Sequence, residues 1–187
     1  MIDYKEFRFA SPPRTGGSWF IHVTSIMGLG QGQKAKLHEP PPSDATGQNL
    51  NVSLVRHPCN WLESYFYALK GGLVGVPLID ELVHSARDSK DINLFADRVA
   101  GFHAGIITEI FDSYKPSTVM RLEDLPWAAG EFFMSLGYSR RDIQCVLDAP
   151  PINCRDHKLT DVKMSKRIRK LVADSEQSLF DRYDYQP

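Results

Sequence analysis

The stretch SPPRTGGSWF, Ser11–Phe20, combines residue types that bind anions. Gly16 and Gly17 allow the backbone to approach a ligand closely, because glycine carries no side chain. Arg14 adds a permanent positive charge with a forked set of donors, and Ser18 adds a hydroxyl group. Successive amide groups in such a turn, at the start of a helix, form a concave site for a phosphate or sulfate group. The alternative is an ordinary strand-to-helix turn, since a glycine-rich turn alone is a weak signal.

A second candidate anion site lies in VRHPCNWLESYF, Val55–Phe66. Arg56 ends an apolar, β-branched segment that is typical of a buried strand. Ser64 lies eight residues further on, in the helix that Pro58 opens. An arginine at a strand end and a serine on the facing helix could jointly hold a second phosphate group. The alternative is a surface arginine and a helical serine that bonds to the backbone.

Strands and helices alternate along the chain, which predicts an α/β fold with three layers, a mostly parallel sheet flanked by helices. The expected strands are Glu6–Ala10, Ala35–His38, Asn51–Arg56 and Ser117–Arg121. The expected helices are Gly17–Met27, Pro58–Leu69, Ile79–Ser85, Asn93–Tyr114, Leu125–Gly137, Arg140–Leu147 and Lys163–Phe180. We expect Asp124 to cap the helix that follows it and Gly137 to end that helix. Ligands of such sheets bind beyond the carboxyl ends of strands, where we expect Pro12–Ser18, His38–Glu39 and Arg56–Pro58.

The composition fits one domain covering residues 1–187 and argues against several classes of protein. Apolar residues make up 42% of the chain, which is enough for a sizeable core. The formal net charge of −1 argues against bulk electrostatic binding to nucleic acid or to an acidic membrane. No segment approaches the ~20 apolar residues of a membrane span. Cys59, Cys145 and Cys154 lack metal-ligand spacing; free thiols in a reducing compartment, and hence a cytoplasmic location, are expected.

Taken in order, these segments resemble the sulfotransferases that use 3′-phosphoadenosine 5′-phosphosulfate (PAPS). PRTGGSW, Pro13–Trp19, is similar to the family's first motif, P-K-[ST]-G-[ST]-T-W. RHPCNWLESYF, Arg56–Phe66, is similar to its second motif, R-[ND]-P-x-[DE]-x-x-x-S-x-[YF], with the same arginine-to-serine spacing. RLEDL, Arg121–Leu125, resembles its R-[YF]-E-[DE]-L segment. The later stretches FFMSLGY, Phe132–Tyr138, and LFDRYDY, Leu179–Tyr185, resemble a helix end and a C-terminal ending of the family.

The resemblance implies a P-loop nucleotide-binding, sulfotransferase-like fold in which the glycine loop cradles the 5′-phosphosulfate of PAPS. Arg14 takes the place of the family lysine that contacts the leaving phosphate, and it keeps the positive charge. Trp19 would lie beside the adenine. Arg56 and Ser64 would hold the 3′-phosphate, which distinguishes PAPS from ATP. The nucleotide-binding residues implied in this way are Arg14, Thr15, Gly16, Gly17, Ser18, Trp19, Arg56 and Ser64.

The expected reaction moves a sulfuryl group from PAPS to a hydroxyl or amine group and leaves PAP as product. Positioning and charge stabilisation dominate such a transfer, and this logic requires no metal. A base must take the acceptor's proton. KLHEP, Lys36–Pro40, resembles the family's K-x-H segment, whose histidine is the base, so His38 is the preferred base. Glu39 is the rival, because some branches of the family use a glutamate, and a His38 that only packs in its loop is the third alternative.

The chain departs from the family pattern at two points. The late R-K-G-x-x-G-D-W segment of cytosolic members is missing. NCRDHK, Asn153–Lys158, takes a similar place, and Arg155 or Lys158 could reach the 3′-phosphate; the alternative is a solvated basic loop. The chain is also short, because the segment between Arg14 and His38 is little more than one helix. With fewer residues to cover the acceptor pocket, the site is expected to be open. It would suit a large acceptor such as a glycan or a peptide, as well as a small molecule.

Two other functions stay open from the sequence alone. A P-loop nucleotide kinase or NTPase would bind ATP with magnesium, but the lysine of the Walker motif is missing. A non-catalytic PAP-binding module of the same fold would bind the nucleotide without turnover. The sequence names neither the acceptor nor an oligomeric state.

Overall fold

The computed structural model describes residues 1–30, 37–40, 50–71, 84, 88–152 and 162–187. The chain is α/β, with a four-stranded mixed sheet and eight α-helices within these residues. Its contacts define two compact units: unit 1 comprises Met1–Val55 and Ser113–Arg155, and unit 2 comprises Arg56–Asp112 and Asp156–Pro187. The α/β class expected from the sequence is confirmed, while the single domain and the three-layer arrangement stay predictions.

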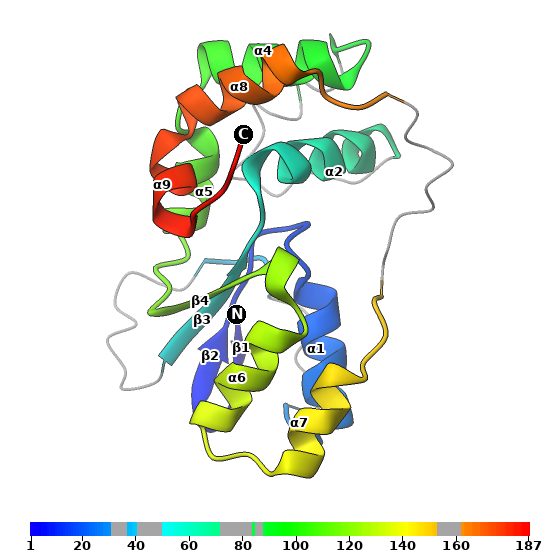
Figure 1. Ribbon diagram of the computed structural model, residues 1–187, viewed down its shortest axis with the longest axis vertical. Coiled ribbons are helices and arrows are strands. Elements are labelled where there is room, and N and C mark those ends of the chain that lie inside the picture. Colours follow the sequence, from blue (N-terminus) through cyan, green and yellow to red (C-terminus); the bar gives the residue numbers. More distant parts are fainter. Residues whose placement is uncertain (31–36, 41–49, 72–83, 85–87, 153–161) are drawn as a thin grey trace. The chain divides into compact units, whose positions relative to one another are not determined.

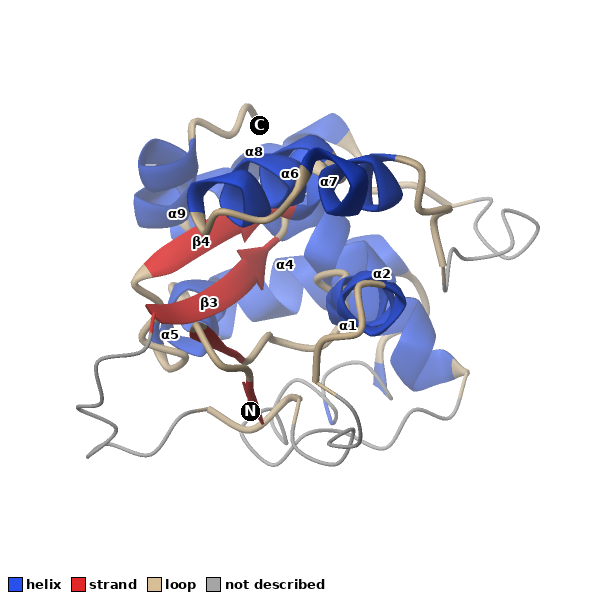
Figure 2. Cartoon of the chain, turned by 90° about the horizontal axis from the view of Figure 1, so that it is seen from below, coloured by secondary structure: helices blue, strands red, loops and turns tan. Residues whose placement is uncertain are grey.

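The sheet belongs to unit 1. Its strands, in spatial order, are β1 (Ile2–Asp3), β2 (Phe7–Phe9), β3 (Leu50–Val55) and β4 (Thr118–Arg121). The edge strand β1 runs antiparallel to β2, whereas β2, β3 and β4 are parallel, as the arrows of β3 and β4 show in Figure 2. Phe9 pairs with Val52 and Val52 with Thr118, so the three parallel strands end at the same edge. Loops that follow them start from this edge.

An aromatic core covers one face of this sheet. Alternation in β2 places Phe7 and Phe9 on that face, and neither is exposed to solvent. The helices of unit 1 are α1 (Gly17–Ile26), α6 (Trp127–Ser135) and α7 (Arg140–Leu147), and they lie beside the sheet in Figure 1. Phe20 of α1 stacks on Phe9 at 4.2 Å and on Phe133 of α6 at 5.7 Å between ring centroids. These stacked rings fix the start of α1 relative to β2.

Helix ends in unit 1 follow the sequence signals closely, with one exception. Gly137 has φ 84° and ends α6, as expected: its amide donates to Met134 and that of Tyr138 to Phe133. The exception is Asp124, which does not cap α6. Its carboxylate accepts two hydrogen bonds from Arg121 instead, at 2.6 and 2.9 Å, within the 3₁₀ turn Leu122–Asp124. The strong arginine fork outcompetes the main-chain amides for this carboxylate.

Unit 2 is helical in the residues that the structure describes. Its helices are α2 (Pro58–Lys70), α4 (Ile92–Phe102), α5 (Ile106–Asp112), α8 (Lys166–Ser175) and α9 (Gln177–Tyr183). The single helices expected over Asn93–Tyr114 and Lys163–Phe180 are therefore wrong, because each is two helices. The first break contains Gly105 with φ 84°, and the second lies at Glu176, where the backbone leaves the helical conformation at φ −115° and ψ 29°.

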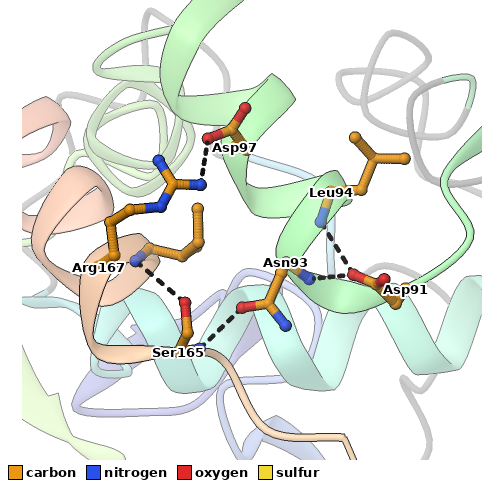
Figure 3. Close-up of polar contacts among 7 residues, drawn as sticks. Asp91, Asn93, Leu94, Asp97, Ser165 and Arg167 are labelled. Atoms are coloured by element: carbon orange, nitrogen blue, oxygen red, sulfur yellow. Dashed lines mark hydrogen bonds and ion pairs between the residues drawn. The ribbon is translucent and has the colours of Figure 1, made fainter.

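Two helix beginnings are joined in unit 2, as Figure 3 shows. The Asp91 carboxylate caps α4 by accepting from the amides of Asn93 and Leu94 at 2.8 and 3.0 Å. Asn93 then accepts from the amide of Ser165 at 2.7 Å, and Ser165 caps α8. Arg167 adds an ion pair to Asp97 at 3.4 Å. One short polar chain thus sets how α4 and α8 pair.

The strands and helices that carry the anion motifs have nearly the expected bounds. The expected strand over Ala35–His38 is wrong in its described part, because residues 37–40 form a turn. A backbone hydrogen bond, from Ser11 N to Leu37 O at 3.1 Å, joins this turn to the segment that follows β2. The helix expected over Ile79–Ser85 lies outside the described residues except for His84.

A buried carboxylate completes the start of α5. Glu176 is 1% exposed and accepts from the amides of Ile107 and Thr108 at 3.1 and 2.9 Å and from the Thr108 hydroxyl at 2.7 Å. Burial raises the pKa of this carboxyl. The bend at Glu176 therefore brings the carboxylate to amides that an α-helix leaves without intrahelical acceptors.

We expect Glu176→Ala to lower the free energy of unfolding by about 3 kcal/mol, because it removes three hydrogen bonds and leaves buried donors without an acceptor. Urea denaturation measures the loss. Glu109→Ala, at an exposed position of α5, is the matched control and should change stability by less than about 0.5 kcal/mol. Equal losses in the two variants would contradict the capping role.

Candidate functional site

The glycine loop follows β2 and leads directly into α1. Arg14 and Gly16 have left-handed backbone conformations, with φ 69° and 96°, and Gly16 is the N-cap residue of α1. No described side chain caps this helix. The amides at its start are therefore turned to the loop and carry the positive end of the helix dipole. This is the local geometry of an anion site.

Buried hydroxyl groups hold the loop in shape. Thr15 is fully buried, and its hydroxyl donates to the carbonyl of Pro12 at 2.7 Å and is hydrogen-bonded to the hydroxyl of Ser11. Thr15 was expected in the nucleotide site, and its side chain instead faces into the protein. Only its backbone can contact a ligand. Ser11 is also fully buried, and no pattern in the sequence singles it out.

The remaining loop residues differ in exposure. Arg14 is half-buried and Ser18 is exposed, so both can reach a ligand from the protein surface. Trp19 is 7% exposed and is part of the core. Gly17 is buried, and a β-carbon there would lie 3.0 Å from Cδ2 of Leu37. The absence of a side chain at Gly17 thus lets Leu37 pack against the loop. Because His38 follows Leu37, this packing also places His38 beside the loop.

His38 is tied to the first residue of the glycine loop. Its ring nitrogen Nδ1 lies 2.8 Å from the carbonyl oxygen of Ser11. Because a carbonyl can only accept, Nδ1 carries the proton, and Nε2 of the neutral ring is the proton acceptor. Glu39 is exposed. His38 contacts the loop through this hydrogen bond, and it has the tautomer that a general base needs.

A pocket of about 360 Å³ opens beside the loop. It lies wholly in unit 1, and its lining residues are Gly16, Trp19, Leu122, Leu125, Pro126, Ala149, Pro151 and Ile152. The fork between Arg121 and Asp124 braces the turn that supplies Leu122 and Leu125, and it lowers the pKa of the Asp124 carboxyl. An apolar pocket next to a glycine loop at a helix start has a composition that suits a flat ring attached to a negatively charged group.

The other predicted residues lie elsewhere in the chain. Arg56, which directly follows β3, is half-buried, and Ser64 is buried in α2. Both belong to unit 2. Arg155 lies outside the described residues. The structure therefore brings together the glycine loop, Trp19 and His38, and the roles of Arg56 and Ser64 in nucleotide binding stay predictions.

Sequence reasoning missed most of the pocket. Leu122 and Leu125 lie in the RLEDL segment, whose resemblance was visible but gave no role to its leucines. Ala149, Pro151 and Ile152 carry no signal of their own, because apolar residues near prolines are common in loops. Among the described residues, no three His, Cys, Asp or Glu side chains gather as a metal site would require.

Comparisons with protein-family models, with curated proteins and with solved structures give no match. In the described part of the chain, every helix is too short or too polar to cross a membrane.

We expect Gly16→Ala to destabilise the protein by about 2–3 kcal/mol, in two parts. The left-handed conformation costs a residue with a side chain about 1–2 kcal/mol, and the new β-carbon would lie 2.6 Å from Cδ1 of Leu122. Gly28→Ala is the matched control, because Gly28 has φ 73° with no atom within 4 Å of the added carbon. Denaturant unfolding of both variants measures the difference in the free energy of unfolding. Equal losses of stability would show that the side chain of Leu122 moves aside at no cost.

Proposed function

We propose that this chain is a PAPS-dependent sulfotransferase with a three-layer P-loop fold, acting in the cytoplasm on a hydroxyl or amine group. The observation that carries the proposal is the hydrogen bond between His38 and the first residue of the glycine loop. Nδ1 of His38 lies 2.8 Å from the carbonyl oxygen of Ser11. An anion loop and a general base are the two parts that sulfuryl transfer needs, and here one residue holds them together. The motif resemblance supplies the identity of the anion.

The described residues of unit 1 fit the donor. Amides at the start of α1 and the guanidinium of Arg14 are suited to a phosphosulfate group. The apolar pocket of about 360 Å³ begins at Gly16 and Trp19, where the resemblance expects the adenine. By the same resemblance, Arg56 and Ser64 would bind the 3′-phosphate. The late loop of the chain adds Arg155 and Lys158 as further candidates for that phosphate; both lie outside the described residues.

In the proposed reaction PAPS supplies the sulfuryl group. His38 accepts the acceptor's proton at Nε2 while the acceptor oxygen or nitrogen bonds to sulfur. The bond between sulfur and the bridging phosphate oxygen breaks, so the products are the sulfated acceptor and PAP. Arg14 and the loop amides face the negative charge that grows on the leaving phosphate. His38 then releases its proton to solvent.

Calorimetric titration with PAP, AMP and ATP–magnesium tests the nucleotide preference. We expect PAP to bind most tightly, because it alone of the three carries a 3′-phosphate. Arg56→Ala should weaken PAP binding by roughly 10–100-fold and leave AMP binding unchanged, since a charge-assisted bidentate contact contributes about 1.5–3 kcal/mol. A preference for ATP–magnesium would favour a kinase or NTPase and would end the sulfotransferase proposal.

His38→Ala should lower turnover by about 10²–10⁴-fold without changing PAP affinity. Turnover is measured as PAP release from PAPS with phenols, alcohols and amines as probe acceptors. His22→Ala, at a half-buried position of α1, is the control and should keep the wild-type rate. Bound PAP without any turnover in the wild type would favour the non-catalytic module, and full activity of His38→Ala would remove His38 as the base.

A further inference from the structure

The main chain of His38 is held by a residue far away in the sequence. The hydroxyl of Tyr114 donates a hydrogen bond to the carbonyl oxygen of His38 at 2.8 Å. Tyr114 is 3% exposed. It lies in unit 1, just after the chain returns to that unit at Ser113 and shortly before β4. A hydroxyl buried to this degree keeps a partner, and here the partner is the backbone of the candidate base.

Three hydrogen bonds converge on two residues of the turn. The amide of Ser11 donates to the carbonyl of Leu37 at 3.1 Å, and the ring of His38 donates back to the carbonyl of Ser11. Tyr114 binds the next carbonyl, that of His38. Two successive peptide groups and one ring are thereby fixed. The first bond joins two main chains and the second needs the ring of His38 itself, so the hydroxyl of Tyr114 is the group that a substitution can remove while His38 is kept.

We infer that Tyr114 is a positioning residue for His38: its hydroxyl fixes the main chain of His38 so that the ring stays on Ser11 and offers Nε2 as the proton acceptor. The role of this contact in catalysis rests on the proposed function, whereas the contact itself does not. Burial raises the pKa of Tyr114, so its hydroxyl keeps its proton over the range in which histidines titrate. The bond is therefore present in both charge states of His38.

Tyr114→Phe removes the donor and keeps the ring that fills the core. Tyr4→Phe is a matched control in the same unit, because Tyr4 is 7% exposed and its hydroxyl is hydrogen-bonded to Thr24 at 2.9 Å. Both variants lose one buried hydroxyl and one hydrogen bond, so a general loss of stability affects both. Only Tyr114→Phe should change the state of His38.

Nitrogen-15 NMR of the full-length protein reads the tautomer of each histidine ring, with His38→Gln used to assign the signal of His38. At a pH well above the histidine range, we expect the Nδ1–H tautomer in the wild type and in Tyr4→Phe, and a mixture of tautomers in Tyr114→Phe. An Nε2–H tautomer in the wild type overturns the inference without any variant. A wild-type signal in Tyr114→Phe overturns it as well.

Turnover and PAP affinity separate this inference from the proposed function. In the assay of PAP release, we expect Tyr114→Phe to be about tenfold slower than Tyr4→Phe at an unchanged KM for PAPS, because only the base is displaced. Equal rates would overturn the positioning role alone. A wild-type protein that binds no PAP would refute the proposed function, and the catalytic role of Tyr114 with it, even if the tautomer depends on Tyr114.

Discussion

The candidate site depends on the hydrogen bonds of one fully buried serine. Ser11 comes just after β2, its amide and carbonyl bind the turn that contains His38, and its hydroxyl binds Thr15 in the glycine loop. Buried polar groups are costly unless they are paired, so these bonds form together or the fold loses stability. The loop and the histidine therefore share one fixed point at the end of a strand.

Parallel pairing explains why distant segments meet at this fixed point. The carboxyl ends of β2 and β4 are held at one edge through β3, with Phe9, Val52 and Thr118 in register. The glycine loop follows β2, and the turn with Leu122 follows β4. They come so close that a β-carbon at position 16 would lie 2.6 Å from Cδ1 of Leu122, so a side chain there would require Leu122 to shift. The apolar pocket is a consequence of that approach.

Local signals in the sequence predicted the parts of the fold that local interactions decide. The loop Pro12–Ser18 does follow a strand and open a helix, Arg140–Leu147 has the expected bounds, and Gly137 ends α6. These features depend on glycine conformations and on the periodicity of a few residues, which are visible in a short window.

Long-range contacts decide what the sequence could not predict. The bend at Glu176 exists because its carboxylate binds amides 68 and 69 positions away, at Thr108 and Ile107. The bond from Tyr114 to His38 spans 76 positions. The sequence predicts Asp124 as the cap of the next helix, whereas its carboxylate binds Arg121. No window of neighbouring residues contains such partners, so propensity alone gives a plausible but incorrect assignment.

The two units interleave along the chain, and this has a consequence for synthesis on the ribosome. β3 is made early, but its neighbour β4 emerges only after the whole first segment of unit 2, Arg56–Asp112. Unit 2 in turn cannot be completed before α8 and Gln186 have been synthesised. The carbonyl of Gln186 accepts a hydrogen bond from the ring of His57 at 2.7 Å. Neither unit can be isolated by a single cut, and a nascent chain cannot finish one before it begins the other. The glycine loop and His38 are made early, but Tyr114 and the pocket residues that follow β4 reach them only when most of the chain has already been made.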